Sequence, residues 1–292
     1  MIVSASYRTD VPTFYGKWFM NRLRAGYCKV TNPYGGQVST VSLAEEDVDG
    51  FVFWTKNMGP FMKFLPEVRE RGFPFLVTYT ITGYPRQFER SVVNADRSVE
   101  HMRRICGEYG PRVCVWRYDT IVLSSLTPLD FHLRNFERLS RNLAGATDEV
   151  VVSFAHYYKK TIRNMSLAAQ RDPFTWEDPE ADEKRRIASR LAEIARSKGM
   201  RFSICAQREY LIPAAEDAKC IDAGRMSDVA GRRIEAGSTG HRKHCGCCES
   251  RDIGAYDTCP HGCVYCYAVN RRELAQRRFR EHDPEGEFLV SS

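Results

Sequence analysis

Short apolar runs alternate with longer amphipathic segments from one end of this chain to the other. Short runs with few polar residues are typical of strands that are buried on both faces. The predicted strands of this kind are Ile2–Ser6, Phe51–Trp54, Phe75–Thr82, Val113–Trp116, Val150–Phe154, Arg201–Cys205 and Ile253–Tyr256. Two further runs, Tyr27–Thr31 and Gln37–Ser42, flank the turn-forming residues Asn32–Gly36, which predicts a hairpin.

The segments between these runs carry apolar residues at helical spacing. The predicted helices are Phe14–Ala25, Pro60–Arg71, Ser98–Tyr109, Pro128–Leu143, Asp182–Lys198 and Ala268–Glu281. Ser98 and Thr127 are expected to cap two of them, and Gly26, Gly110 and Gly199 are expected to end three. Strands that alternate with helices in this way predict an α/β fold, in which helices cover a parallel sheet.

Polar side chains follow nearly every predicted strand. They are Arg8 and Asp10, Thr55, Lys56 and Asn57, Thr80 and Thr82, Arg117 and Asp119, Ser153 and His156, and Cys205. In a β/α barrel the chemistry lies at the carboxyl ends of the strands, so this pattern favours a TIM-like, partial parallel β/α barrel over residues 1–292. Some of these side chains are equally expected to cap helices or to bond within loops. Four charged ones, Asp10, Lys56, Arg117 and Asp119, are the candidates for catalysis.

Composition narrows the class of protein. Apolar residues make up 43% of the chain, the formal net charge is +6 and there are 11 cysteines. No apolar run reaches the roughly 18 residues of a membrane span, and the N-terminus does not resemble a signal peptide, so we expect a cytoplasmic protein. Thiols stay reduced there, so cysteines crowded toward one end indicate metal rather than disulfides. The positive charge is a mild bias toward phosphate or nucleic acid, but aromatic and basic residues are not interleaved densely enough to predict a nucleic-acid platform.

The strongest signal is the stretch Cys259-Pro-His-Gly-Cys263-Val-Tyr265-Cys266. Three thiolates at spacings of four and three suit a [4Fe–4S] cluster and leave one of its irons without a protein ligand. An iron left open can bind a reacting molecule, as the open position of a catalytic zinc site does. The alternative is a zinc site, for which His261 or an upstream cysteine would supply the fourth ligand.

This stretch resembles the cysteine loop of the radical-SAM enzymes, including Tyr265 as the aromatic residue beside the cluster. The resemblance implies that the open iron binds S-adenosylmethionine. Reductive cleavage would then give a 5′-deoxyadenosyl radical that acts on a substrate the sequence does not identify. An electron donor such as a flavodoxin or ferredoxin is implied as a partner. The expected cofactor-binding residues are Arg8, Thr80, Thr82 and Tyr265.

The order of the elements departs from that family. A radical-SAM barrel begins with a strand, the cysteine loop and a helix, whereas here this unit comes last and only 26 residues follow Cys266. We therefore expect a circularly permuted barrel of radical-SAM type, in which Ile253–Tyr256 lies beside Ile2–Ser6. Arg8 and Asp10 should then lie within about 10–15 Å of the cluster, because adjacent strands are about 5 Å apart. The competing arrangement is a separate C-terminal metal domain.

Four other segments resemble a bacterial family that is catalogued as a domain of unknown function with a radical-SAM-like cysteine cluster at its C-terminus. They are Phe53–Asn57, Thr80–Tyr84, Trp116–Asp119 and Asp252–Tyr256. The cysteine stretch alone also resembles the cluster loop of spore photoproduct lyase. Radical-SAM enzymes hold the amino group of S-adenosylmethionine with a Gly-Gly-Glu type of segment, and the equivalent positions here, Ser6–Asp10, have no such motif. This absence adds weight to the alternative function, a non-catalytic iron–sulfur or zinc protein for electron transfer or nucleic-acid binding.

A second group of cysteines belongs to the cysteine-rich segment 205–267. Cys205, Cys220, Cys245 and Cys247 are expected to bind an auxiliary [4Fe–4S] cluster, with Cys248 as a spare. The rivals are a four-cysteine zinc site and thiols without metal. Three isolated cysteines, Cys28, Cys106 and Cys114, are expected in the core. The histidines near the thiols are expected as loop hydrogen-bond partners rather than as ligands, and they are His241, His244 and His261.

Overall fold

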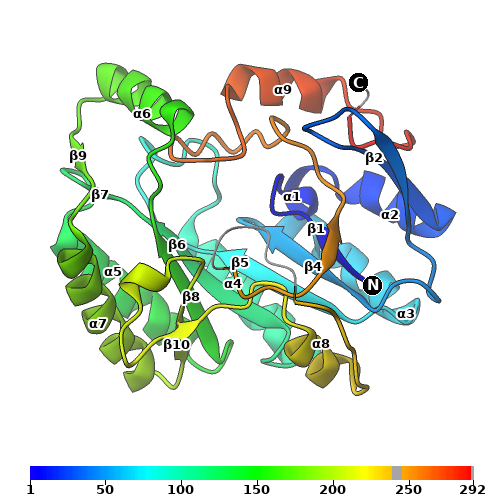
Figure 1. Ribbon diagram of the computed structural model, residues 1–292, viewed down its shortest axis with the longest axis horizontal. Helices are drawn as coiled ribbons and strands as arrows, with labels where there is room; N and C mark the ends of the chain where they lie inside the picture. Colours follow the sequence, from blue (N-terminus) through cyan, green and yellow to red (C-terminus); the bar gives the residue numbers. More distant parts are fainter. Residues whose placement is uncertain (239–244, 291–292) are drawn as a thin grey trace.

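An eight-stranded parallel sheet forms the centre of the computed structural model, which describes residues 1–238 and 245–290 (Figure 1). In spatial order its strands are β11 (Glu216–Asp217), β10 (Arg201–Ile204), β8 (Glu149–Phe154), β6 (Cys114–Ile121), β5 (Phe75–Thr80), β4 (Gly50–Thr55), β1 (Ile2–Ala5) and β12 (Ser250–Asp252). Every neighbouring pair is parallel, so the carboxyl ends lie along one edge. The predicted α/β fold is confirmed. Within the described residues the sheet stays open, because β11 and β12 do not pair.

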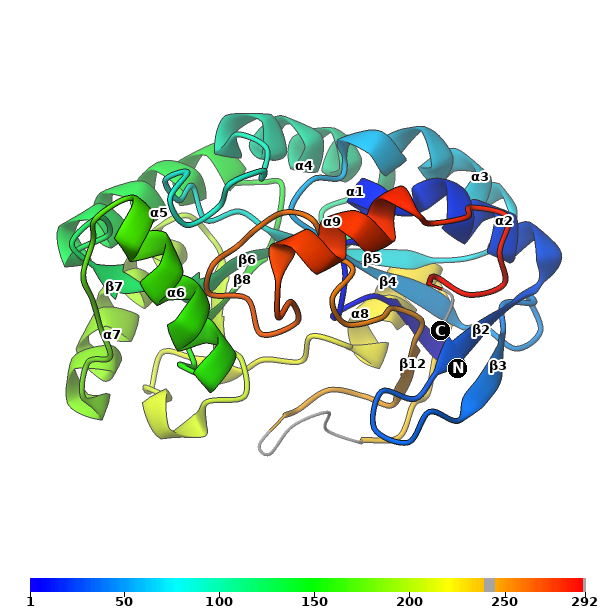
Figure 2. The same ribbon diagram turned by 90° about the horizontal axis from the view of Figure 1, so that it is seen from above.

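Helices cover the two faces of the sheet unequally (Figure 2). One face shares an apolar core with α2 (Gly16–Ala25), α3 (Leu65–Glu70), α4 (Ala95–Tyr109), α5 (Leu129–Leu143) and α7 (Ala181–Ser197). On the opposite face α8 (Ala223–Ala230) contacts β5. Two further helices, α6 (Lys159–Arg171) and α9 (Arg272–Arg280), lie beyond the same end of the strands in both figures.

The smaller elements complete the fold. The predicted hairpin is present as β2 (Tyr27–Thr31) and β3 (Val38–Ser42). A second antiparallel pair consists of β7 (Leu123–Ser124) and β9 (Trp176–Glu177). Short helical turns are α1 (Val11–Phe14), η1 (Gly59–Phe64) and η2 (Arg208–Tyr210).

Side chains alternate between the two faces of the central strands. On β4, Phe51 and Phe53 pack in the core beneath the helix layer, and Val52 packs in a second core on the opposite face. The equivalent residues of β5, β6 and β8 join Val52 there, together with α8 and part of the second cysteine group; they are Leu76, Val115, Val151, Met226, Cys220 and Cys247. The segment that carries the second cysteine group therefore covers this face of the sheet.

This second face becomes polar toward the carboxyl ends of the strands. Residues two apart on a strand share a face, so Val115 is followed by Arg117 and Asp119, and Val151 is followed by Ser153. Arg117 and Ser153 both donate hydrogen bonds to Asp119. The apolar half of the face thus seals the core, and the polar half presents charged side chains where the strands end.

The first and last strands of the sequence lie side by side. Ile2–Ser4 pair in parallel with Ser250–Asp252, which confirms the predicted neighbourhood and contradicts a separate C-terminal metal domain. The predicted bounds of the last strand, Ile253–Tyr256, are wrong. Asp252 accepts a hydrogen bond from the Gly254 amide at 3.0 Å, and this local turn ends the strand at Asp252.

Several predicted helix starts are also wrong. Asn94 caps α4 by accepting from the Asp96 amide at 2.8 Å, so Ser98 lies inside the helix. Thr127 does not cap α5, because its hydroxyl donates to the Val122 carbonyl at 2.7 Å. The last helix starts at Arg272 rather than Ala268, since the Ala268 carbonyl instead accepts from the Asp257 amide at 3.0 Å. Helix α6 was not predicted.

Candidate functional site

The three loop cysteines, Cys259, Cys263 and Cys266, lie on the segment that joins β12 to α9, and each is partly buried. The loop folds back on itself, since the Cys266 amide donates to the Cys263 carbonyl at 3.2 Å. The Ala268 amide points at the Cys266 sulfur, at 3.3 Å. Hydrogen bonds from amides to sulfur are one of the means by which proteins adjust iron–sulfur clusters.

Asp10 anchors this loop to the N-terminal part of the chain. Its buried carboxylate accepts hydrogen bonds from the Thr13 amide at 2.9 Å, the Thr55 hydroxyl at 2.8 Å and the Lys56 amide at 2.7 Å. Its Oδ2 atom lies 2.8 Å from Nε2 of His261 in the cysteine loop. Burial alone would raise the pKa of Asp10, but the hydrogen bond and charge of His261 and the Lys56 amide outweigh it and hold the pKa below its usual value. His261 is thus a loop hydrogen-bond partner, as predicted, whereas His241 and His244 lie outside the described residues.

A second segment, residues 88–91 of the loop between β5 and α4, is joined to the cysteine loop by backbone contacts. Glu89 forms an isolated antiparallel bridge with Cys263, and the Val264 amide donates to the Phe88 carbonyl at 3.0 Å. The Ser91 amide donates to the His261 carbonyl at 2.9 Å. The cysteine loop is therefore fixed on one side by Asp10 and on the other by this segment.

Glu89 is the centre of a buried polar network beside the cysteines. Its Oε1 atom accepts from Lys56 Nζ at 2.8 Å, from the Thr82 hydroxyl at 2.6 Å and from the Tyr265 hydroxyl. Burial would raise the pKa of Glu89 and lower that of Lys56, but their mutual attraction prevails, so the pKa of Glu89 is lowered and that of Lys56 is raised. Both side chains are therefore charged, although only 4% and 14% of their surfaces are exposed.

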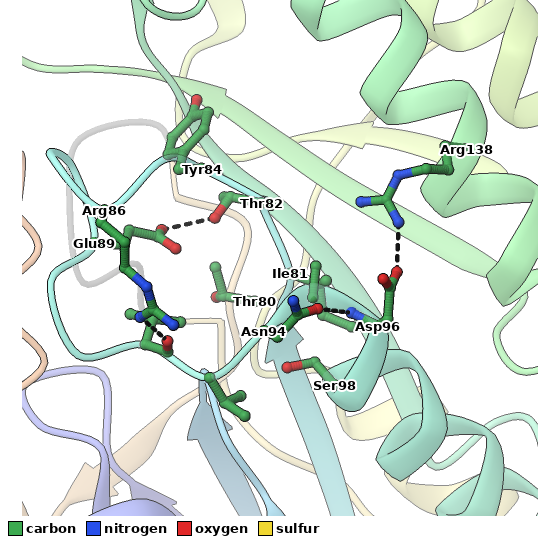
Figure 3. A pocket seen from close by; sticks show the side chains of 14 residues that line it. Thr80, Ile81, Thr82, Tyr84, Arg86, Glu89, Asn94, Asp96, Ser98 and Arg138 are labelled. Carbon is green, nitrogen blue, oxygen red and sulfur yellow. Dashed lines mark hydrogen bonds and ion pairs between the residues drawn. The ribbon is translucent and has the colours of Figure 1, made fainter.

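A polar cavity of about 210 Å³ opens next to this network (Figure 3). Two of the predicted cofactor-binding residues, Thr80 and Thr82, line it together with Glu89. Its far wall is the start of α4, where Asp96 pairs with Arg138. Thr80, Thr82 and Tyr265 are thus brought to one place.

Arg8, the other predicted cofactor-binding residue, does not line this cavity and lies among aromatic rings. Its guanidinium stands 5.3 Å from the ring centres of both Tyr7 and Tyr256. It lies 3.8 Å from Asp252, whose pKa is raised by burial even though Arg8 opposes the shift. Arg8 thus connects the end of β1 to the segment that leads into the cysteine loop.

The structure also brings together the second cysteine group, defined as Cys205, Cys220, Cys245 and Cys247. The sulfurs of Cys205 and Cys220 lie 3.4 Å apart, one residue beyond the end of β10 and three residues beyond the end of its neighbour β11. Cys247 interacts with both Cys220 and Cys245. The hydrogen bond with Cys205 lowers the pKa of Cys220. The hydrogen bond with Cys247 and burial raise it by more, so the pKa is raised to about 12. The pKa values of the Cys205 and Cys247 thiols are raised as well, so these three thiols are protonated at neutral pH unless a metal displaces the protons.

Arg117 and Asp119, at the end of β6, face this second group. Arg117 donates to the Cys220 sulfur at 2.8 Å and to the Asp119 carboxylate. The Trp54 ring covers the guanidinium at 5.2 Å. A buried guanidinium against a sulfur suits a thiolate, the form in which cysteine binds metal, better than a neutral thiol.

The two cysteine sets differ in how they fit a metal. In residues 1–238 and 245–290 no three His, Cys, Asp or Glu side chains converge as the ligands of one ion do. The ligands of a [4Fe–4S] cube do not converge in this way either, because each thiolate binds a different iron. The loop cysteines fit a cube in their donor chemistry, since the Ala268 amide faces one sulfur and the Lys56 charge acts on another, that of Cys263.

No pattern in the sequence points to Glu89. Its partners Lys56 and Tyr265 lie 33 and 176 residues away in the chain, and its own loop shows no periodic pattern. The catalytic candidates divide between two places. Asp10 and Lys56 contact the region of the cysteine loop, whereas Arg117 contacts the second group and Asp119 pairs with Arg117. The negative charge of Asp119 contributes to raising the pKa of Lys56, so the two places are neighbours.

The chain belongs to the family of the domain of unknown function DUF1848, whose model matches residues 2–268. No curated protein matches the chain. Among solved structures, a crystal structure of a D-hydantoinase is 12% identical over 66% of this chain and 37% of that one, with a TM-score of 0.28. The chain thus spans little more than a third of that protein, and a likeness of this size carries no argument. No helix among the described residues is long and apolar enough to cross a bilayer.

Proposed function

We propose that this protein is a radical-SAM-like enzyme whose [4Fe–4S] cluster is held by Cys259, Cys263 and Cys266. The open iron would bind S-adenosylmethionine, and an electron from the cluster would drive its cleavage to methionine and a 5′-deoxyadenosyl radical. The observation that carries the proposal is the place of the three cysteines, on one loop at the carboxyl edge of a parallel sheet and beside a buried Lys56–Glu89 pair.

The strand order supports a permuted partial barrel as the framework. From β12 the sheet continues through β1, β4, β5, β6, β8, β10 and β11, so each strand lies beside the next one in a single direction. Doubly wound sheets reverse their strand order at a switch point, and this sheet does not. Moving β12 from the end of the chain to its start would restore the order strand, cysteine loop, helix and remaining strands that radical-SAM enzymes have.

The residues around the loop have separable tasks in this proposal. The Asp10–His261 contact and the backbone bonds of residues 88–91 fix the orientation of the loop. Tyr265 donates a hydrogen bond from its hydroxyl to Glu89, and this bond fixes its ring in the same loop as the cysteines. The Tyr84 ring packs edge-on against the Tyr265 ring with their centres 5.8 Å apart, so two aromatic rings would restrict the access of water beside the loop.

We also assign metal to the second cysteine group, as an auxiliary [4Fe–4S] cluster next to Arg117. The charge and hydrogen bond of Arg117 at Cys220 favour metal-bound thiolate over free thiol. A second candidate is zinc, and one observation favours it. Thiolates about 2.3 Å from one tetrahedral zinc lie about 3.8 Å apart, close to the 3.4 Å between Cys205 and Cys220.

The test is the release of 5′-deoxyadenosine. Protein reconstituted without oxygen and reduced with dithionite should release it from S-adenosylmethionine, and the Cys263→Ala variant should not. Absence of release from wild-type protein with an intact cluster would remove the enzymatic proposal. Metal analysis decides the second group: about eight irons per chain indicate two clusters, and about four irons with one zinc indicate a zinc site.

A further inference from the structure

The expected motif for the amino group of S-adenosylmethionine is missing, and the structure shows that its place is occupied. At the equivalent positions, Ser6 donates its hydroxyl to Asp252 at 2.8 Å. Asp10 already accepts hydrogen bonds from Thr13, Thr55 and Lys56, and its carboxylate also contacts His261. Neither side chain is available for a ligand, so the amino-acid end of the cofactor needs other partners.

Lys56 and Glu89 have hydrogen-bonding capacity left for such a ligand. An ammonium group has three donors, and Lys56 uses one of them on Glu89. All three hydrogen bonds that Glu89 accepts go to Oε1, and within the described residues none goes to Oε2. The Glu89 carboxylate also lines the cavity of about 210 Å³ (Figure 3).

The pair is also close to the loop cysteines. Glu89 bridges to Cys263 through the backbone. Tyr265, two residues beyond Cys263, donates to the same Glu89 oxygen as Lys56 does. A buried ion pair is weak evidence for stability, because both charges lose their hydration. A buried Lys56–Glu89 pair beside the cysteine loop is better explained by a ligand that binds to both charged groups.

From this geometry we infer that Lys56 and Glu89 bind the amino-acid end of S-adenosylmethionine. The inference rests on the proposed function and names the partners of the cofactor at that same site. In S-adenosylmethionine the α-amino group, a hydrogen-bond donor, and the α-carboxylate, an anion, are attached to the same carbon. Glu89 would accept from the amino group and Lys56 would donate to the carboxylate, which replaces the missing motif by a pair of side chains.

The test compares three ligands that differ at the amino-acid end. S-adenosylmethionine and S-adenosylhomocysteine carry the amino and carboxylate groups, and 5′-methylthioadenosine lacks both. Their affinities are measured by equilibrium dialysis under anaerobic conditions with reconstituted full-length protein. Lys56→Met and Glu89→Gln should each lower the affinity for S-adenosylmethionine and S-adenosylhomocysteine about tenfold or more, because a charged hydrogen bond is lost. The affinity for 5′-methylthioadenosine should stay the same.

Matched controls are available in the same chain. Lys184 is 6% exposed and pairs with Asp178, and Glu149 is 9% exposed and pairs with Arg225. Lys184→Met and Glu149→Gln remove the same charges away from the cysteine loop and should leave all three affinities unchanged. If Glu89→Gln does not fold, Glu89→Asp and Lys56→Arg are measured in its place. They keep the charges and should lose less affinity than Lys56→Met.

The outcomes separate the two proposals. Unchanged affinities for the two amino-acid ligands, or an equal loss for all three ligands, would overturn the role of Lys56 and Glu89 while 5′-deoxyadenosine release by the wild type stands. Failure of the wild-type protein to bind either amino-acid ligand, with its iron intact, would overturn the proposed function and this inference together. The expected result is a lower affinity for the two amino-acid ligands with an unchanged affinity for 5′-methylthioadenosine. Damage to the fold would lower all three affinities and would not produce this pattern.

Discussion

Asp10 Oδ2 and His261 Nε2 lie 2.8 Å apart, although 251 residues separate them in the chain. The contact joins the residue that caps α1 to the centre of the cysteine loop. It exists because β1 and β12 are neighbours in the sheet, so the segments that follow both strands start from the same edge.

His261→Ala is expected to reduce the iron content of the reconstituted protein. The substitution removes one anchor of the cysteine loop and leaves the buried Asp10 carboxylate with one partner fewer. The free energy of unfolding should fall by about 1–3 kcal/mol. Iron per chain and the midpoint of thermal unfolding measure the effect. His101→Ala is the control, since His101 bonds Tyr79 beneath the helix layer. Full iron content in His261→Ala would show that the anchor is dispensable.

Asp252→Ala is expected to loosen the junction of β1 and β12. The Asp252 carboxylate accepts from the Ser4 hydroxyl at 2.8 Å, the Ser6 hydroxyl at 2.8 Å and the Tyr7 amide at 3.0 Å. Without it the Ser4 and Ser6 hydroxyls and the Tyr7 amide lose their acceptor, so the amides of β1 should exchange with deuterium faster. Asp283→Ala, a change on an exposed turn, should leave that exchange unchanged. Equal exchange in both variants would contradict the role given to Asp252.

Stability should fall as the pH drops below the usual pKa of histidine, and His132 is one cause. Burial lowers the pKa of His132 from 6.5 to about 4, while hydrogen bonds to backbone carbonyls oppose the shift. The ring faces the Tyr118 hydroxyl, the Tyr84 ring and the Val122 carbonyl. The unfolded chain binds the proton more tightly, so this part of the stability is present above pH 6.5 and is lost between about 6.5 and 4.

The size of this effect can be isolated with His132→Gln, which does not titrate. At pH 5 the wild-type protein should have lost about 2 kcal/mol through His132 relative to pH 7. Urea unfolding at both pH values gives the two free energies for each protein. The drop should be smaller in the variant by that amount. The same drop in both proteins would mean that His132 is already accessible to protons in the folded state.

Burial explains which parts of the fold could be predicted. The strands β1, β4, β5, β6, β8 and β10 show as apolar runs because both of their faces are covered. Helix α6 (Lys159–Arg171) escaped prediction because Thr161, Met165 and Ala168 are its only buried residues and two of them are small. The start of α4 was placed wrongly because Asn94 and Ser98 are both good caps, and only the path of the chain decides between them.

The site was predictable only where its chemistry is local in sequence. The spacing of Cys259, Cys263 and Cys266 is visible in one stretch, whereas Lys56, Glu89 and Tyr265 come from three distant loops. Glu89 has no motif, since its role depends on a bridge between two loops that the sheet brings together. The grouping of Cys205, Cys220, Cys245 and Cys247 followed from composition, but the contact of Arg117 with Cys220 did not.

The second cysteine group should be sensitive to oxidation once its metal is removed. The sulfurs of Cys205 and Cys220 lie 3.4 Å apart, so the metal-free protein should form a disulfide between them when treated with diamide, which takes up the two electrons and two protons. Metal-loaded protein should react more slowly, because its thiolates are held by the metal. Alkylation of the remaining thiols followed by peptide mass spectrometry identifies the linked pair. Cys205→Ser should abolish the link, and Cys106→Ser, at an isolated cysteine, should not. A link formed equally fast with the metal in place, or one between other cysteines, would contradict a metal held by Cys205 and Cys220.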